Sequence, residues 1–274
     1  MKRLEKKIGG KNVAFKKFGG IDEMVTYIEH TPKDDGFDDT FDGSREVYKD
    51  FYGADSYAEA REYIKKGVNI KDIMVAINTG NREYNKKQMV RHVCGGAPCV
   101  AAAAANSPRA MYQKRNEQIT GAYDIFINCG CNCNVTPQEF KDAGIEILKE
   151  VLRISAIKPV NLYVGATAID FQSRNIVGYG MQVMDAGKSF NAARVSYALT
   201  EAGFFRVFGF ALYARTEGVW SPDNNWCLGR ALSVHNADLN KKVLSAAYKN
   251  MLYVNITDVI EGRRGALKEL EVIK

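Results

Sequence analysis

The sequence predicts an α/β fold in which a mainly parallel sheet is covered by helices on both faces. Three observations in the second half of the 274-residue chain carry this prediction. Short apolar runs typical of buried strands alternate with longer runs whose apolar residues recur at helical spacing. Helix caps and glycine turns stand between them. Such alternation is typical of layered proteins in which crossover helices join parallel strands.

The first 119 residues are predicted to form a mostly helical region that follows a short basic segment. Residues 12–15 alternate in polarity as an edge strand would, between two pairs of glycines. Residues 21–30 form an amphipathic helix, because their apolar side chains share one helical face, and a further helix is expected over about 69–90. The polar stretch at 115–121 marks the boundary with the second half of the chain.

Two helices have clear start signals. Ser56 and Thr136 are each followed three residues later by a glutamate, Glu59 and Glu139, which is the arrangement of a capping box. The first of these helices is expected to end at Gly67, because glycine readily adopts the left-handed conformation that closes many helices.

Residues 120–274 are predicted to form a Rossmann-like domain around the sheet. Each expected strand is short and apolar at its centre. The strands are expected over 122–130, 159–170, 178–187 and 252–256. The helices are expected over 135–156 and 191–215, and from about residue 241 up to the last strand.

The composition is that of an ordinary globular protein whose excess charge is concentrated at one end. At 46% hydrophobic and 26% charged residues, the chain is too apolar to be disordered. The net charge is +6, and the first eighteen residues, with seven Lys or Arg and one Glu, account for all of it. The rest of the chain has no net charge, which excludes a uniformly basic nucleic-acid binder.

The sequence also predicts that the protein does not contact membranes. It contains no run of about eighteen apolar residues that would span a bilayer. The basic N-terminus is not followed by the apolar segment of a secretory signal. We therefore expect a cytoplasmic location and reduced cysteines.

The first candidate site is the polar tip of the strand at 122–130. Ligands of open α/β sheets bind at the carboxyl ends of strands, and here a helix N-terminus follows. Asparagines that satisfy backbone groups of a tight turn are the structural alternative. A divalent metal is disfavoured, because amides and glycine lack the charge of its usual ligands. The tip carries Asn128, Gly130, Asn132 and Asn134.

The second candidate is a cysteine set that could hold zinc or supply a nucleophile. Zinc needs four tetrahedral ligands, and these cysteines would provide them if two segments met. Their spacing is not the standard spacing of structural zinc ligands, and cysteine is often a small buried hydrophobe. Inert thiols are therefore the favoured interpretation. The candidate ligands are His92, Cys94, Cys99, Cys129, Cys131 and Cys133.

The third candidate is the basic N-terminus, which could contact nucleic-acid phosphates. Phe15 and Phe18 are interleaved with its lysines, as in proteins that stack single-stranded bases. The acidic residues at 34–42 compete for the same cations within the chain. The basic residues are Lys2, Arg3, Lys6, Lys7, Lys11, Lys16 and Lys17.

Several short patches occur in a characteristic order: Phe51-Tyr52-Gly53 with Ser56 and Glu59-Ala60, Gly96–Val100, Ser107–Tyr112, Gly144, Lys188–Asn191 and Phe204-Phe205-Arg206. Together they resemble a family of uncharacterised tailed-bacteriophage proteins with a degenerate von Willebrand A-like C-terminal half. The resemblance covers about residues 45–260 as an order of patches. It implies a von Willebrand A-like sheet and a protein that acts in the host cytoplasm, and it supplies no catalytic residues.

The sequence thus favours a non-enzymatic phage protein of binding, assembly or host-interaction function. It would contact a protein partner through the carboxyl edge of the sheet, with the four tip residues and Arg109, whose guanidinium could hold a carboxylate or phosphate. The first alternative is a nucleic-acid-binding accessory protein that uses the basic N-terminus. The second is an enzyme that depends on the cysteines or on a metal.

Overall fold

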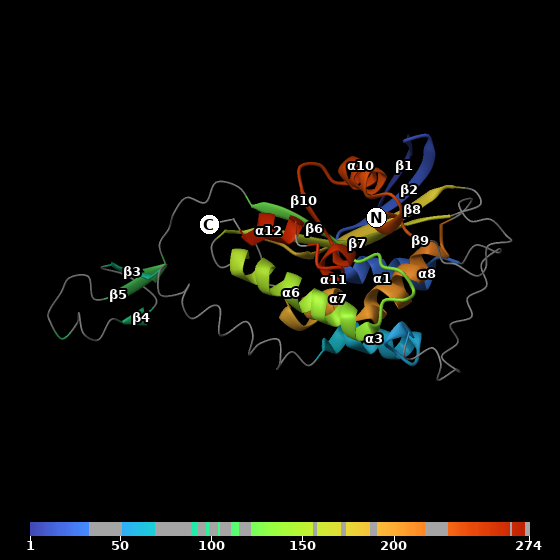
Figure 1. Cartoon of the computed structure of the whole chain (residues 1–274). Helices are drawn as coiled ribbons and strands as arrows, with labels where there is room; N and C mark the ends of the chain where they lie inside the picture. Colours follow the sequence, from blue (N-terminus) through green and yellow to red (C-terminus); the bar gives the residue numbers. More distant parts are fainter. Residues whose placement is uncertain are drawn as a thin grey trace.

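A mixed sheet of seven strands lies at the centre of the described chain, with helices on both of its faces (Figure 1). The structure is a computed structural model of residues 1–274. The residues that the structure describes are 1–32, 51–68, 89–92, 97–98, 104, 111–114, 122–155, 158–170, 174–186, 191–216, 230–263 and 265–271.

The strand order in the sheet is β1-β2-β8-β7-β6-β10, and the short β9 pairs with β7. The strands are β1 (Lys2–Ile8), β2 (Lys11–Phe18), β6 (Tyr123–Asn128), β7 (Val160–Ile169), β8 (Ile176–Met184), β9 (Arg230–Ala231) and β10 (Leu252–Asn255). A second sheet of three short strands contains β3 (Met89–His92), β5 (Met111–Lys114) and β4 (Ala97–Pro98). The first residues of β3 lie where the sequence predicted the end of a helix.

The prediction of an α/β fold is confirmed, but the prediction of a mainly parallel sheet was wrong. Strands β6, β7 and β10 are parallel, whereas β7 and β8 are antiparallel, as are β1 and β2. The reason lies in the connections, because a parallel crossover needs a dozen or more residues. Only six residues separate Ile169 from Ile176, which permits a hairpin and excludes a crossover.

The basic N-terminal segment is a β-hairpin of the main sheet rather than a tail. Gly9 and Gly10 have positive φ angles of 56° and 78°, as two-residue hairpin turns require. Strand β2 pairs in parallel with β8, so the sheet draws strands from both sides of the predicted boundary at residue 119. The four-residue edge strand expected over 12–15 is thus part of an eight-residue strand with a neighbour on each side.

Helices cover the two faces of the sheet unequally. One face carries α1 (Ile21–His30), α6 (Pro137–Ser155), α7 (Ala192–Thr200), the π-helix η1 (Phe204–Gly209), α8 (Phe210–Tyr213), α11 (Ile256–Ile260) and α12 (Gly265–Glu271), with α3 (Tyr57–Lys66) packed on α7. The other face carries α9 (Leu232–His235) and α10 (Ala237–Ala247). Figure 1 shows α10 above the sheet and the larger helical layer below it.

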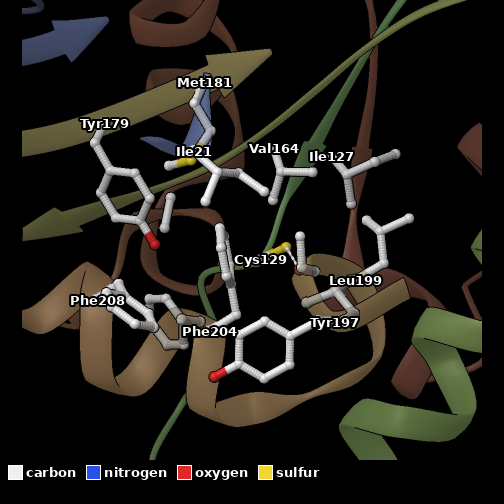
Figure 2. Close-up of a cluster of buried hydrophobic side chains, with 14 of the residues drawn as sticks. Ile21, Ile127, Cys129, Val164, Tyr179, Met181, Tyr197, Leu199, Phe204 and Phe208 are labelled. Atoms are coloured by element: carbon white, nitrogen blue, oxygen red, sulfur yellow. Dashed lines mark hydrogen bonds between the residues drawn. The ribbon is translucent and has the colours of Figure 1, made fainter. Parts of the chain in front are cut away.

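Alternate residues of each strand enter two separate cores, because successive strand side chains point to opposite faces. The larger core joins Ile127 and Val164 of the sheet to Leu199 of α7 (Figure 2). The smaller core joins Phe126 of the sheet to Leu244 of α10.

The predicted helix caps are present. Ser56 Oγ accepts a hydrogen bond from the Glu59 amide at 3.1 Å, and Gly67 ends α3 with a φ of 75°. Thr136 Oγ1 accepts from the Glu139 amide at 3.2 Å, and the Thr136 amide donates back to that carboxylate at 2.8 Å. Thr136 and Glu139 thus form a complete capping box, whereas the Glu59 carboxylate accepts from the amide of Asp55, one residue before the N-cap, at 2.6 Å.

Candidate functional site

The carboxyl ends of β6 and β10 form a topological switch point. From β6 the chain passes through α6, on one face of the sheet, to β7, which lies on one side of β6. On the other side of β6 lies β10, which the chain enters from α10 on the opposite face of the sheet. Open α/β sheets bind ligands at such points, outside the carboxyl ends of the strands. Asn128 ends β6, Asn255 ends β10, and the two residues are partners in the strand register.

Asn255 is the centre of a hydrogen-bonded cluster at this point. Its Oδ1 accepts from Asn128 Nδ2 at 3.1 Å and from Asn240 Nδ2, on the first turn of α10, at 3.2 Å. Its Nδ2 donates to Asp258 Oδ2 of α11 at 2.9 Å. One side chain thus joins β6, β10 and two helices.

The cluster runs from the protein interior to the surface. At the buried end, Thr167 Oγ1 of β7 donates to Asn240 Oδ1 at 2.6 Å. At the outer end, Arg263 donates to Asp258 Oδ1 from Nε at 3.1 Å and from Nη2 at 3.0 Å. Thr167 and Asn240 are almost fully buried, whereas 58% of the Arg263 side chain is exposed.

Asn128 positions the loop that follows it instead of facing solvent. The residue is completely buried, and its Oδ1 accepts from the Gly130 amide at 3.1 Å. This is the local side-chain-to-backbone hydrogen bond by which asparagine fixes a turn. The structural alternative is therefore confirmed for Asn128, and Gly130 is buried as well. Only Asn132, half-buried, and Asn134, exposed, present polar side chains outward.

A buried arginine that is absent from the predicted site residues holds the other end of this loop. Arg206 of η1 donates to the carbonyls of Val135 at 2.5 Å and Asn132 at 3.4 Å. It also donates to the Phe51 carbonyl at 2.6 Å and lies 4.1 Å from the centre of that ring. A lone arginine within an otherwise apolar helix was the available signal, because a charge is buried only when it is well paired.

The thiols of the loop are mostly buried and protonated. Figure 2 shows Cys129 within the larger core, and burial raises the pKa of its thiol. Burial also raises the pKa of Cys131 to about 11, although the nearby guanidinium of Arg206 opposes this shift. Cys133 is exposed. Since the thiolate is the reactive form, Cys129 and Cys131 are poor nucleophiles at neutral pH.

Among the described residues, no three His, Cys, Asp or Glu side chains are grouped as metal ligands. The zinc prediction also involves residues outside this range. Its ligands Cys94 and Cys99 lie outside the described residues, and of His92 only the backbone, in β3, is described. Arg109 of the predicted binding edge and the acidic residues 34–42 also lie outside the described residues.

The seven N-terminal cations divide into two groups. Lys16 is buried and Lys17 half-buried, and both bind backbone carbonyls of helices. Phe15 and Phe18 are also buried in the cores, so neither ring is available for stacking on a base. The remaining cations are exposed except for the half-exposed Lys11; they are Lys2, Arg3, Lys6, Lys7 and Lys11.

The fold and the switch-point cluster define a mixed-sheet α/β protein with a polar, asparagine-rich carboxyl edge. The chain belongs to the family described as a domain of unknown function, DUF7192, whose model matches residues 2–260. Neither the curated proteins nor the solved structures contain a match. Within the described residues, no helix combines the length and apolar character needed to cross a membrane.

Proposed function

We propose that the chain is a non-enzymatic binding protein that contacts a protein partner through the loop at the carboxyl edge of β6. The observation that carries this proposal is the fixation of the loop at both ends. Asn128 holds its start through the Gly130 amide, and Arg206 holds its end through the Val135 carbonyl. Loops held by a rigid scaffold are the usual carriers of binding residues.

The loop is ordered before any partner arrives, which favours binding. Ordering a flexible loop costs free energy on association, and a preformed loop avoids most of that cost. Asn132 and Asn134 then offer amide donors and acceptors from a fixed backbone. Such side chains suit a polar protein surface that matches them in shape and hydrogen bonding.

Three titratable groups around the loop, those of Asp258, Cys129 and Cys131, are held by the fold, which favours recognition over catalysis; the Cys133 thiol is exposed. The Asp258 carboxylate is already bound by Asn255 and Arg263. Cys129 and Cys131 are held as thiols by burial. A general acid or base needs a titratable group free to exchange a proton with a substrate, and these groups are committed to the fold.

The proposal keeps the setting that the sequence resemblance implies, a phage-encoded protein in the host cytoplasm. Under this proposal, the parallel strands β6, β7 and β10 and the helix α6 correspond to the von Willebrand A-like half of the resembling family. The nucleic-acid alternative is supported by the exposed cations of β1 and is weakened by the inward-facing Lys16 and Lys17.

Affinity capture with matched variants tests this proposal. The double variant Asn132→Ala/Asn134→Ala removes two outward amides and leaves intact the backbone groups that Arg206 binds. The control, Lys149→Ala, lies on the exposed side of α6, towards the other end of that helix. Each is used as bait, with nuclease treatment, in a lysate of cells that carry the gene.

We expect a defined protein partner to be recovered by the wild type and the control, and about tenfold less by the double variant, which corresponds to roughly 1.4 kcal/mol of binding free energy. Equal recovery by all three proteins would contradict the proposal. Recovery that depends on intact nucleic acid would favour the alternative function.

A further inference from the structure

Strand β1 is an edge strand of the main sheet, at the opposite margin from β10 (Figure 1). Its seven residues pair with β2 in a continuous register. In the part of the chain that the structure describes, no strand pairs with its other side. An unpaired edge presents a row of backbone donors and acceptors that can template another strand.

The edge strand is strongly basic on both faces. Lys2 and Lys6 point to the face covered by α10, while Arg3 and Lys7 point to the other face. All four side chains are exposed, and the single acid, Glu5, is already paired with Arg3 at 2.6 Å. Any strand added to this edge therefore meets cations above and below it.

This charge pattern disfavours a second copy of the chain as the occupant. In an antiparallel pair of two β1 strands centred on Glu5, the two glutamates would face each other, and Arg3 would face Lys7 of the other copy. Like charges directly opposite each other on neighbouring strands are destabilising. The same charges attract an acidic strand and so select it.

The hairpin is held in place and does not need to be ordered on binding. Leu4 and Ile8 pack against the smaller core, which α10 completes. Lys17 of β2 donates to the carbonyl of Ala247, the last residue of α10. A preformed strand lowers the cost of adding another one to it.

Nucleic acid fits this surface less well than a polypeptide does. Phe15 and Phe18, the aromatic residues interleaved with the lysines, are 0% and 3% exposed. Binding of single strands usually combines cations with such rings as stacking platforms. Phosphates would also leave the backbone groups of the strand edge without regular partners, whereas a peptide strand pairs with them.

We propose that β1 is a docking strand for an acidic, extended polypeptide segment, which adds to the sheet beside Lys2–Ile8. Backbone hydrogen bonds give the segment its register, and carboxylates on its two faces meet the Arg3 and Lys7 pair and the Lys2 and Lys6 pair. This surface is separate from the β6 loop, so the proposal stands independently of the function proposed above.

A labelled synthetic peptide that repeats Glu-Glu-Thr-Thr is a suitable probe, because neighbouring glutamates of a strand point to its two faces. Its binding to the full chain is measured by fluorescence anisotropy and compared with that of three matched peptides. The first replaces every glutamate with glutamine, which removes the charge. The second carries N-methyl groups on alternate backbone amides along one edge, which removes strand pairing on that edge and keeps the charge. The third carries the methyl groups along the other edge.

We expect the acidic peptide to bind at least about tenfold more tightly than the glutamine peptide, and more weakly as salt rises. Methylation of one edge should weaken binding about tenfold, and methylation of the other edge should not. Amide hydrogen exchange in residues 2–8 should slow when the peptide binds.

A charge-reversed protein provides the matched variant. Lys6→Glu/Lys7→Glu should lose most of the affinity, whereas Lys149→Glu, which changes an exposed lysine of α6, should bind normally. Equal binding of acidic and glutamine peptides to the wild type would overturn the proposal, as would binding that neither edge's methylation weakens. Tighter binding of a single-stranded oligonucleotide that displaces the peptide would assign the surface to nucleic acid instead.

Discussion

Lys16 and Lys17 are neighbours on β2, and their ammonium groups bind the C-terminal ends of two helices on opposite faces of the sheet. Lys16 Nζ donates to the carbonyl of Arg215 at 2.7 Å, just beyond the end of α8. Lys17 Nζ donates to the carbonyl of Ala247 at the end of α10. Because successive strand side chains alternate between faces, one dipeptide anchors both helical layers to β2. A cation at a helix C-terminus also stabilises its unpaired carbonyls and its dipole.

Replacement of Lys16 by methionine should destabilise the fold substantially. Lys16→Met keeps most of the apolar stem but removes the donor to the Arg215 carbonyl and to Thr216 Oγ1. Leaving buried acceptors unpaired costs about 1–3 kcal/mol, so we expect a loss of about 2–3 kcal/mol in the free energy of unfolding. Denaturation in urea measures it.

The matched control is Lys6→Met, because Lys6 is exposed on β1. Surface changes of this kind usually shift stability by less than about 0.5 kcal/mol. If Lys16→Met unfolds at the same urea concentration as Lys6→Met, the anchoring role assigned to Lys16 is wrong.

Alkaline pH should unfold the protein cooperatively, because several buried tyrosines must lose a proton. Burial raises the pKa of Tyr57 to about 12 and raises those of Tyr179, Tyr197 and Tyr248 above the ordinary value as well. In the unfolded chain these groups ionise near pH 10. Their contribution to stability is therefore complete below pH 10 and is lost as pH rises from 10 towards their folded pKa values.

The measurement is tyrosinate absorbance followed together with circular dichroism. We expect these tyrosines to ionise only as the helical signal is lost, in one transition above pH 10. Ionisation of all the tyrosines near pH 10 with an unchanged dichroism spectrum would contradict the burial-driven pKa shifts.

Local signals in the sequence predict much of the fold. In the cap of α3 and in that of α6, the two partner residues are three positions apart along the chain, so the sequence contains the whole of each motif. Strand directions depend on connection length, and the six residues between β7 and β8 already exclude a parallel pair. The Gly9-Gly10 turn likewise marks the hairpin at the basic N-terminus.

The candidate site was less predictable, because its contacts join distant segments. The position of Asn128 at a strand end was correctly identified, but its partner Asn255 lies 127 residues away. Whether an asparagine faces solvent or a second asparagine depends on how β6 and β10 align, and no local pattern encodes that. The same holds for Arg206, whose carbonyl partners come from two other segments.

Asn255 should be the most sensitive position of the switch-point cluster. Asn255→Ala leaves the amides of Asn128 and Asn240 without their shared acceptor and removes a donor from Asp258. We expect a loss of about 2–4 kcal/mol in the free energy of unfolding, since Asn128 and Asn240 are buried. Asn134→Ala, on the exposed part of the loop, should change stability by less than about 0.5 kcal/mol. Similar unfolding midpoints for the two variants would show that the cluster contributes little to stability.

Arg206 should control access to the thiol of Cys131. In the wild type, Cys131 is buried, and the guanidinium of Arg206 lies 4.0 Å from its sulfur and holds the carbonyls of Asn132 and Val135. Arg206→Met removes those contacts and should loosen the loop. We therefore expect a thiol-reactive dye to modify Cys131 at least about tenfold faster than in the wild type. The exposed Cys133 should react at its wild-type rate.

The reaction is followed by fragmentation mass spectrometry, which assigns the label to Cys129, Cys131 or Cys133 within their shared peptide, at a dye concentration far below that which unfolds the chain. Cys129 is the internal control, because its sulfur lies in the larger core beside the Ala198 carbonyl and does not contact Arg206 among the described contacts. Faster labelling of Cys129 and Cys131 together would indicate global unfolding. Unchanged labelling of Cys131 in Arg206→Met would show that the arginine does not fix the loop, and the preordered surface proposed for partner binding would lose its main support.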